Sequence, residues 1–212
     1  FKDLKKIELA SKASAVISQN YTEINSYAAD NKQVDKINEK VREDIGFTQK
    51  EGIKFEAIKT KSSMSKSENK AIAANYQKGD IIQVNRSTKG LKRFSEYEVV
   101  DINTQKNQLT IETSTHQVTL DARELINVSI GEKKELEFVE GEKIVVTRNN
   151  KKLGINNGDI GFVQSFSKEK SELNVKFGKK EVTINTNEFK NMNYSYATSL
   201  HRGQGSSVQK AV

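Results

Sequence analysis

The chain has 212 residues and a formal net charge of +7, from 35 Lys and Arg against 28 Asp and Glu. It contains no Cys, Pro or Trp and only two histidines, His116 and His201, which excludes disulfide frameworks, thiolate zinc sites, thiol catalysis and a histidine-rich metal site. No apolar run is long enough to span a membrane, so we expect a folded cytoplasmic protein without membrane insertion. Both ends interrupt a pattern, and we expect a piece of a longer protein.

The first 75 residues carry alternating helix and strand patterns. Apolar residues at helical spacing predict a helix over residues 1–19, and a strand is expected over residues 24–29. A capping box at residues 30–33 then opens a helix that ends at Gly46. Another strand is expected over residues 53–58, and a second capping box at residues 65–68 predicts a short helix through Ala74. This part therefore reads as α/β.

A repeat occupies the middle of the chain. Residues 79–86 return 62 positions later as residues 141–148, with a glycine, an acid, aliphatic residues and an arginine in the same register. Leu91 aligns with Leu153 at that offset. After a shift of two residues in the intervening loops, the match resumes at an offset of 64. Two copies of one small unit are therefore expected in tandem.

Each copy shows the period-two alternation of half-buried strands. The expected strands cover residues 80–86, 97–102, 108–113 and 117–121, and again 142–148, 160–165, 171–177 and 181–185. Short strands with one long polar loop after the first predict small antiparallel SH3-like barrels. We expect one barrel over residues 76–129 and another over residues 138–190, joined by a charged linker at residues 130–135.

Basic residues gather in the long loop of each expected barrel. They are Arg86, Lys89, Lys92 and Arg93 in the first loop and Arg148, Lys151 and Lys152 in the second. If the loops face the same way, they form one basic stripe that contacts nucleic-acid phosphates; two ordinary solvated loops are an equal alternative. Tyr76, Tyr97, Phe162 and Phe166 are expected to fill the cores rather than stack on bases. Glu140 and Glu142 have no evident partner, and we expect no catalysis from them.

The C-terminal segment carries a resemblance to a known family. Residues 196–208 resemble motif V of the superfamily 1 helicases related to conjugative relaxase-helicases of the TraI/TrwC type, with Arg202 in place of the family's Lys and Ser199 in place of its Thr. Residues 141–163 are similar to the insertion called 2B in that family. Residues 27–38 resemble the strand and helix that open its second RecA-like domain.

The resemblance implies an α+β fold in which two tandem small antiparallel SH3-like β-barrels are inserted in a partial RecA-like α/β unit, formed by residues 1–75 and 191–212. It also implies that Ser199 and His201 lie towards single-stranded DNA, and Gln204 and Gly205 near the nucleotide cleft of the parent helicase, which would use ATP and Mg²⁺. The chain has no phosphate-loop motif, so we expect no catalytic residue, metal site, cofactor or enzyme activity in this piece alone.

Three functions remain open at this point. The first is a non-catalytic segment of a conjugative relaxase and helicase that binds single-stranded DNA during plasmid transfer. The second is a translocation signal, a protein-interaction module recognised by the coupling protein of a type IV secretion system. The third is an autonomous tandem-barrel nucleic-acid binder outside conjugation.

Overall fold

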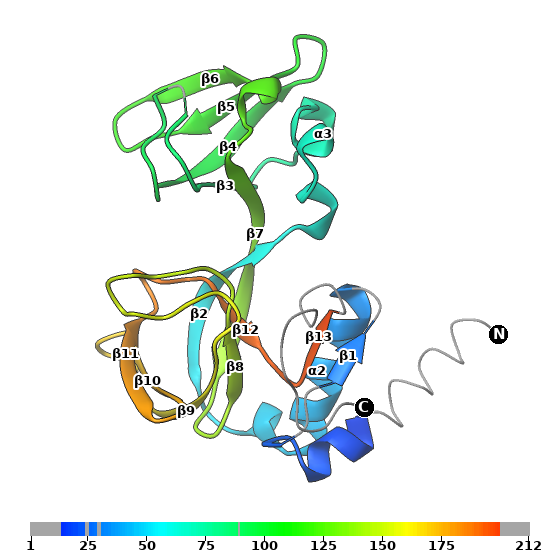
Figure 1. Ribbon diagram of the computed structural model, residues 1–212, viewed down its shortest axis with the longest axis vertical. Helices are drawn as coiled ribbons and strands as arrows, with labels where there is room; N and C mark the ends of the chain where they lie inside the picture. Colours follow the sequence, from blue (N-terminus) through cyan, green and yellow to red (C-terminus); the bar gives the residue numbers. More distant parts are fainter. Residues whose placement is uncertain (1–13, 24–25, 29–30, 89, 200–212) are drawn as a thin grey trace, which may run out of the picture. The chain divides into compact units, whose positions relative to one another are not determined.

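The computed structural model describes residues 14–23, 26–28, 31–88 and 90–199. The chain forms two compact units. The discontinuous unit combines Phe1–Glu56 with Glu135–Val212, and the inserted unit is Ala57–Lys134. The chain passes from one unit to the other within strands β2 (Ile53–Thr60) and β7 (Val128–Phe138) (Figure 1).

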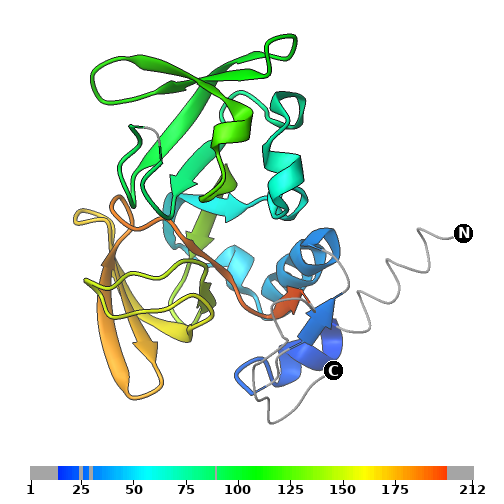
Figure 2. The same cartoon turned by 45° about the horizontal axis from the view of Figure 1, so that its top comes forward.

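The discontinuous unit contains a small α/β element. Residues 14–19 are helical, and β1 (Ser26–Ala28) and α2 (Asn31–Asp44) follow. Strand β1 pairs in parallel with β13 (Ala197–Ser199), and α2 packs on both strands (Figure 2). Helix α2 buries residues at helical spacing, and the chain leaves it through Gly46, whose φ of 74° fits the predicted glycine C-cap. All the other described strands lie between α2 and β13 in the sequence.

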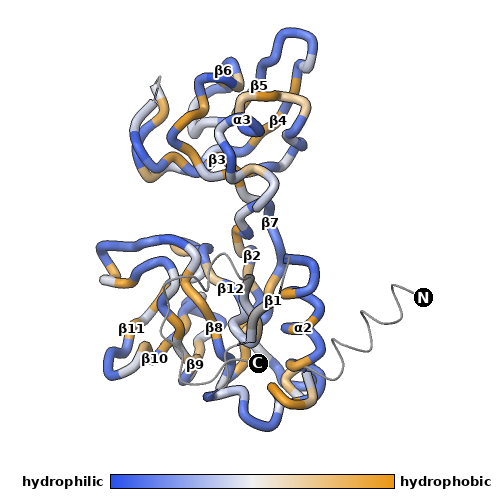
Figure 3. The backbone as a smooth tube through the Cα atoms, turned by 45° about the vertical axis from the view of Figure 1, so that its right-hand side comes forward, coloured by the Kyte–Doolittle hydropathy of each residue, from blue (hydrophilic) through white to orange (hydrophobic). Residues whose placement is uncertain are grey.

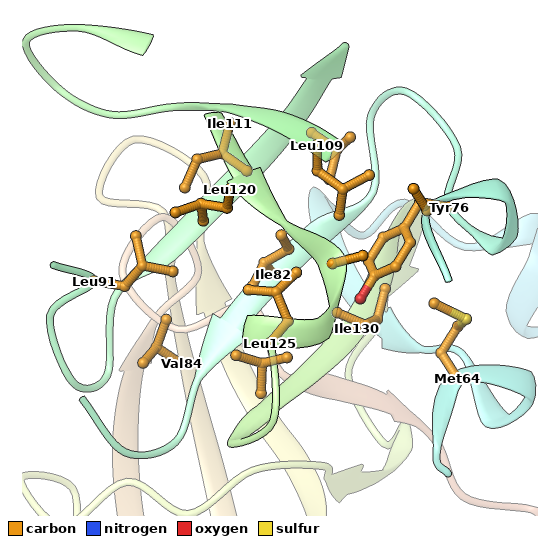
Figure 4. Close-up of a cluster of buried hydrophobic side chains, with 14 residues drawn as sticks. Met64, Tyr76, Ile82, Val84, Leu91, Leu109, Ile111, Leu120, Leu125 and Ile130 are labelled. Atoms are coloured by element: carbon orange, nitrogen blue, oxygen red, sulfur yellow. The ribbon is translucent and has the colours of Figure 1, made fainter. Parts of the chain in front are cut away.

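The inserted unit holds the first repeat. Its short helices and its strands are η2 (Ser62–Met64), α3 (Ser67–Lys70), η3 (Ala73–Asn75), β3 (Ile81–Val84), β4 (Glu96–Asn103), β5 (Gln108–Glu112), β6 (Gln117–Asp121) and η4 (Ala122–Glu124). The sheet order is β2-β7-β3-β4-β5-β6. A cluster of buried apolar side chains, including Ile82, Leu109 and Ile111, fills the interior of the unit (Figure 4).

The second repeat forms a five-stranded sheet in the discontinuous unit. After η1 (Phe47–Gln49) and β2, its strands are β8 (Lys143–Val146), β9 (Ile160–Ser167), β10 (Glu172–Phe177), β11 (Lys180–Asn185) and β12 (Met192–Tyr194). The sheet order is β11-β10-β9-β8-β12. Hydrophobic and hydrophilic residues alternate along these strands, as the period-two pattern predicts (Figure 3).

The duplication extends to backbone detail. Strand β7 pairs antiparallel with β3 in the first repeat, and β12 pairs antiparallel with β8 in the second. Gly79 and Gly141 open the two repeats with φ of 88° and 85°. Asn107 and Ser171, at the corresponding turns, both have φ of 53°. The repeat therefore includes its closing strands, which the sequence comparison did not reach.

Both sheets are open. Among the described strands, β6 and β11 each have a single neighbour. A sheet closes into a barrel when its two edge strands pair, and among the described strands β6 does not pair with β2, nor β11 with β12. The architecture is a mixed α+β fold with two antiparallel sheets.

Two local expectations were wrong. Residues 130–135 are not an irregular linker: they belong to β7, which is buried at Ile130 and Gly131 and again at Leu136 and Phe138, with the charged residues between them mostly exposed. The second capping box does not form: α3 starts after Lys66 without a side-chain cap and ends at Lys70. The Lys70 carbonyl accepts a hydrogen bond from the buried Tyr76 hydroxyl at 2.8 Å, which helps to end the helix there.

Candidate nucleic-acid interface

The candidate interface is the loop between β3 and β4, residues 85–95, which we call the first-repeat loop. Leu91, only 4% exposed, fixes it to the core beside Val84 (Figure 4). Thr88 and Leu91 form an isolated antiparallel bridge, which narrows the loop to a tight turn at Gly90, where φ is 81°. The loop is therefore held at its middle as well as at its ends.

Hydrogen bonds also hold the base of the first-repeat loop. The Asn85 amide donates to the Asn127 carbonyl at 2.9 Å, and its side-chain nitrogen donates to Ser129 Oγ at 2.9 Å. The Thr88 hydroxyl donates to the Glu124 carbonyl at 3.2 Å. These bonds fix the loop against the turn between η4 and β7, so its side chains project from a defined backbone.

The predicted cations of this loop are on its surface. Arg86, Lys92 and Arg93 are exposed, while Lys89 lies outside the described residues. Arg93 Nε donates to the Asn85 carbonyl at 3.3 Å, which holds the guanidinium near the start of the loop. Residues 85–95 include no acidic side chain, so the cations are not neutralised within the loop.

The second-repeat loop, residues 147–159 between β8 and β9, has a similar bridge, here between Asn150 and Ile155. Ile155 is 1% exposed, whereas Leu153 is half-buried. The alignment of Leu91 with Leu153 is therefore wrong, because two extra residues in the bridged turn shift the buried position to Ile155. Lys180 Nζ donates to the Leu153 and Gly154 carbonyls at 2.9 and 2.8 Å and pins that turn.

The cations of the second-repeat loop differ in exposure. Lys151 and Lys152 are exposed, and Arg148 is half-buried with an interaction of its own. The two loops belong to different compact units, so a single basic stripe stays a prediction. Lys151 and Lys152 are the side chains of this loop that are open to phosphate contact.

Sequence reasoning missed Phe94 in the first-repeat loop. Its side chain is 60% exposed, its φ is 67°, and the Arg93 guanidinium carbon lies 4.3 Å from its ring centroid. A bulky residue in left-handed conformation is a rare outlier, and such outliers cluster at functional sites. The offset of 64 aligns Phe94 with Gly158, and that mismatch is the signal in the sequence that could have found it.

Of the four aromatic residues weighed for base stacking, two are placed by the structure in or against the core of the inserted unit. Tyr76 is 4% exposed within the buried cluster, and burial raises the pKa of its hydroxyl well above the usual range. Tyr97 packs against that cluster. Phe162 and Phe166 are half-buried on β9.

A buried polar cluster anchors the second repeat to α2. Arg42 Nε donates to both carboxylate oxygens of Glu142 at 3.1 Å, and the Tyr196 hydroxyl donates to Glu142 Oε1 at 2.6 Å. The Arg42 guanidinium carbon also lies 4.3 Å from the Tyr194 ring centroid. The expectation that Glu142 lacks a partner was wrong, since its partners lie far away in the sequence.

Burial governs the ionisation of this cluster. Removal from water raises the pKa of Glu142 to about 7, and the opposing effects of Arg42 and the Tyr196 hydroxyl offset only part of that rise. Burial lowers the pKa of the neighbouring Lys143 to about 8, and its Nζ donates to the Tyr21 carbonyl at 3.0 Å. Their hydrogen bonds tie β8 and β13 to α2 and to the segment before β1, and we assign them a structural role.

The first repeat has an equivalent anchor. Asp80, at the position of Glu142, is 2% exposed and accepts a hydrogen bond from Lys61 Nζ at 2.5 Å. Its other oxygen accepts from the Gln77 amide at 3.0 Å. The acid that follows the opening glycine thus fixes each repeat to a cation upstream in the same unit.

The segment that resembles motif V is described only at its start. Tyr196 is fully buried, and Ser199 ends β13, where it pairs with Ala28. His201, Gln204 and Gly205 lie outside the described residues, so their predicted roles stay predictions.

Other kinds of site find little support in the described part of the chain. It contains no group of three His, Cys, Asp or Glu side chains suited to a metal ion. A cavity of about 420 Å³ lies beside Glu51, Glu137 and Lys168, but Glu51 is paired with Lys168 and Glu137 Oε1 accepts from the Gly52 amide at 3.1 Å. None of the described helices has the length and apolar character needed to cross a bilayer.

Comparisons with known proteins give structural matches only. No family model matches the chain, and no curated protein does. Similar solved structures include a Pif1 helicase in a study of unwinding at forked double-stranded DNA, with 18% identity over 36% of this chain and 21% of that chain and a TM-score of 0.32. Unliganded Pif1 from Bacteroides sp. has 14% identity over 92% of this chain and 47% of that chain, with a TM-score of 0.38. The chain spans less than half the length of either solved chain.

Proposed function

We propose that this chain is a DNA-contacting segment of a superfamily 1 helicase of the conjugative relaxase-helicase type, and that it binds single-stranded DNA without catalysing a reaction itself. The observation that carries the proposal is the first-repeat loop. Its exposed cations Arg86, Lys92 and Arg93 stand on a backbone fixed by hydrogen bonds, with no acid among residues 85–95. Such a surface attracts phosphates and pays little ordering entropy on binding.

In the proposal, the second-repeat loop is a further phosphate-contacting surface of its own. Lys151 and Lys152 are exposed on a turn that Lys180 and the bridge to Ile155 hold in place. Each loop contacts backbone phosphates, and affinity then falls steeply with salt because bound DNA releases counterions. The contacts to phosphate carry no sequence information, so the proposed binding is tolerant of sequence.

The arrangement of the chain also supports a helicase origin. Strands β1 and β13 are parallel neighbours with α2 packed on them, and both repeats are inserted between α2 and β13. This is the order expected for a partial RecA-like unit that carries tandem SH3-like units as an insertion. The resemblance of residues 196–208 to motif V points the same way. ATP and Mg²⁺ would act in the parent motor, outside this segment.

Fluorescence anisotropy with a labelled single-stranded oligothymidylate tests the proposal. The wild-type chain is expected to bind at low salt, and the double variant Arg86→Ala/Lys92→Ala to bind at least tenfold more weakly. The matched control Lys106→Ala/Lys176→Ala removes the same charge from exposed positions outside both loops and is expected to bind nearly as the wild type. Absence of wild-type binding, or equal losses in both double variants, would refute the proposal.

A second candidate is a protein-interaction module recognised by the coupling protein of a type IV secretion system. The observation in its favour is the pair of open edges, β6 and β11, each with one neighbour among the described strands. An exposed edge strand offers unpaired backbone groups to a partner strand. A pull-down with the cognate coupling protein is expected to retain the chain if this holds, and failure beside a transfer-competent full-length control would contradict it.

A further inference from the structure

Phe94 occupies a backbone position with positive φ, a conformation that favours glycine. The Phe94 amide donates to the Val84 carbonyl at 2.8 Å, and in the second repeat the Gly158 amide donates to the Val146 carbonyl at 2.8 Å. Both residues have positive φ, 67° for Phe94 and 98° for Gly158. Because glycine adopts this conformation without strain and phenylalanine does not, the closing turn alone gives no reason for an aromatic residue.

Packing does not explain Phe94 either. The side chain is 60% exposed, and the apolar interior of the inserted unit is filled by other residues, with Leu91 as the contribution of the loop. The strained conformation is therefore not offset by burial of the ring. Strain that folding does not need is a reason to look for a ligand.

The ring is held in place rather than free. The Arg93 guanidinium lies over it at 4.3 Å from the centroid, and Arg93 Nε is bound to the Asn85 carbonyl at 3.3 Å. On the backbone, the Ser95 amide donates to the Lys92 carbonyl at 3.3 Å, which closes the turn that carries Phe94. A planar apolar surface is thus presented beside cations, on a backbone that is already ordered.

We propose that Phe94 stacks on a base of single-stranded DNA while Arg86 and Lys92 contact the flanking phosphates. A flat apolar ring among cations suits a nucleotide, which offers a π-face and a negative charge together. The bases of a duplex are stacked on each other, so the ligand is a single strand. The second-repeat loop, with Gly158 at the same place, contributes phosphate contacts only. This inference rests on the proposed function. It gives base stacking to the first repeat alone and phosphate contacts to both repeats.

The experiment compares the wild-type chain with Phe94→Gly, the residue that the second repeat tolerates at this position. Both bind an oligothymidylate and an abasic strand of the same length in anisotropy titrations at fixed salt. We expect Phe94→Gly to bind the oligothymidylate about tenfold more weakly, in the range found for one base-aromatic stack. On the abasic strand, the two proteins are expected to bind equally, and the salt dependence of binding is expected to be unchanged.

Two controls make the result specific. Ile126→Gly removes another exposed apolar side chain of the inserted unit, 63% exposed, and is expected to leave binding unchanged. Thermal melting is expected to show Phe94→Gly folded at least as stably as the wild type, so a loss of affinity is not a loss of structure.

The other outcomes of the titrations refute either base stacking by Phe94 or the proposed function. If the wild type binds the oligothymidylate and Phe94→Gly binds it equally well, stacking by Phe94 is refuted while the proposed function stands, and the exposed ring becomes a contact for a protein. An equal loss on the abasic strand also refutes stacking. If the wild type binds no single-stranded DNA, the proposed function fails first, and the inference fails with it.

Discussion

At the residue scale, the buried cluster of Arg42, Glu142 and Tyr196 makes folding sensitive to pH. Glu142 is fully buried, yet its carboxylate accepts bonds from Arg42 and from the Tyr196 hydroxyl. A carboxyl group in this setting holds its proton more tightly than in the unfolded chain, because desolvation penalises the charged form more than its partners stabilise it.

The first prediction concerns the pH dependence of stability. The folded pKa of Glu142 is about 7 against an ordinary value of 4.5. The contribution of this group is therefore fully present below pH 4.5 and lost as the pH rises through 7. Urea denaturation of the wild type across this window is expected to show falling stability, and Glu142→Gln to show a flatter profile. An unchanged profile in the variant would contradict the assignment.

The second prediction concerns the Tyr196 hydroxyl. Tyr196→Phe keeps the fully buried ring and removes the hydrogen bond to Glu142 Oε1, which is 2.6 Å long. Bonds to charged or strongly polar partners contribute about 2 kcal/mol, so the free energy of unfolding is expected to fall by about that amount. Tyr97→Phe, at a half-buried position, serves as the control with a smaller expected loss. A Tyr196→Phe variant as stable as the wild type would show that the bond contributes nothing.

The third prediction exchanges the two left-handed positions. A non-glycine residue in this conformation costs about 1 to 2 kcal/mol. Since Phe94 is 60% exposed and little burial is lost, Phe94→Gly is expected to raise the free energy of unfolding by about 1 kcal/mol. Gly158→Phe is expected to lower it by a similar amount, because φ is 98° there. A lower free energy of unfolding for Phe94→Gly, or a higher one for Gly158→Phe, in chemical denaturation would contradict the interpretation that the Phe94 backbone is strained.

At the element scale, the two loops differ by an insertion that fixes which residue is buried. The bridge joins Thr88 to Leu91 in the first repeat and Asn150 to Ile155 in the second. The longer bridged turn contains Lys151 and Lys152, so the insertion adds exposed charge without moving the buried anchor away from the sheet.

The fourth prediction follows from this register. Ile155→Ala is expected to lower the free energy of unfolding by about 3 kcal/mol, as for other fully buried aliphatic residues. Leu153→Ala, at a half-buried position, is expected to cost under about 1 kcal/mol. Chemical denaturation measures the free energy of unfolding of both variants. A larger decrease for Leu153→Ala than for Ile155→Ala would contradict this register and support the alignment of Leu91 with Leu153.

Most strands of the two repeats could be predicted from the sequence. The strands after Gly79 and Gly141 were found within a few residues, because buried and exposed positions alternate along them. The charged run after Ile130 hid the continuation of β7, since Glu132 and Lys134 take the positions in step with Ile130 and Leu136 and so interrupt the period-two pattern.

The candidate site was only partly predictable. Clustering of like charges in the sequence singled out Arg86, Lys92 and Arg93, and the structure places all three on the surface; their contact with DNA stays a prediction. The partners of Glu142 were not predictable, since Arg42 and Tyr196 meet it only after the chain has folded. Phe94 was not predicted, because the feature that distinguishes it is a positive φ, which composition does not reveal.

At the scale of the whole molecule, the chain is organised as a long insertion between two parallel strands. Ser26 pairs with Ala197, and both repeats lie between them in the sequence. In the proposed function, the α/β element belongs to the parent motor and the inserted repeats contact DNA. In that proposal, the cations of the first-repeat loop bind the phosphates of a single strand.

The most direct test is the salt dependence of single-stranded DNA binding by the wild type and by Arg86→Ala/Lys92→Ala. For a single strand, the slope of log K against log salt is about −0.7 per phosphate neutralised. If the first-repeat loop binds phosphates as proposed, the double variant has a slope shallower by about 1.4, whereas Lys106→Ala/Lys176→Ala keeps the wild-type slope. Equal slopes for the wild type and Arg86→Ala/Lys92→Ala would contradict it.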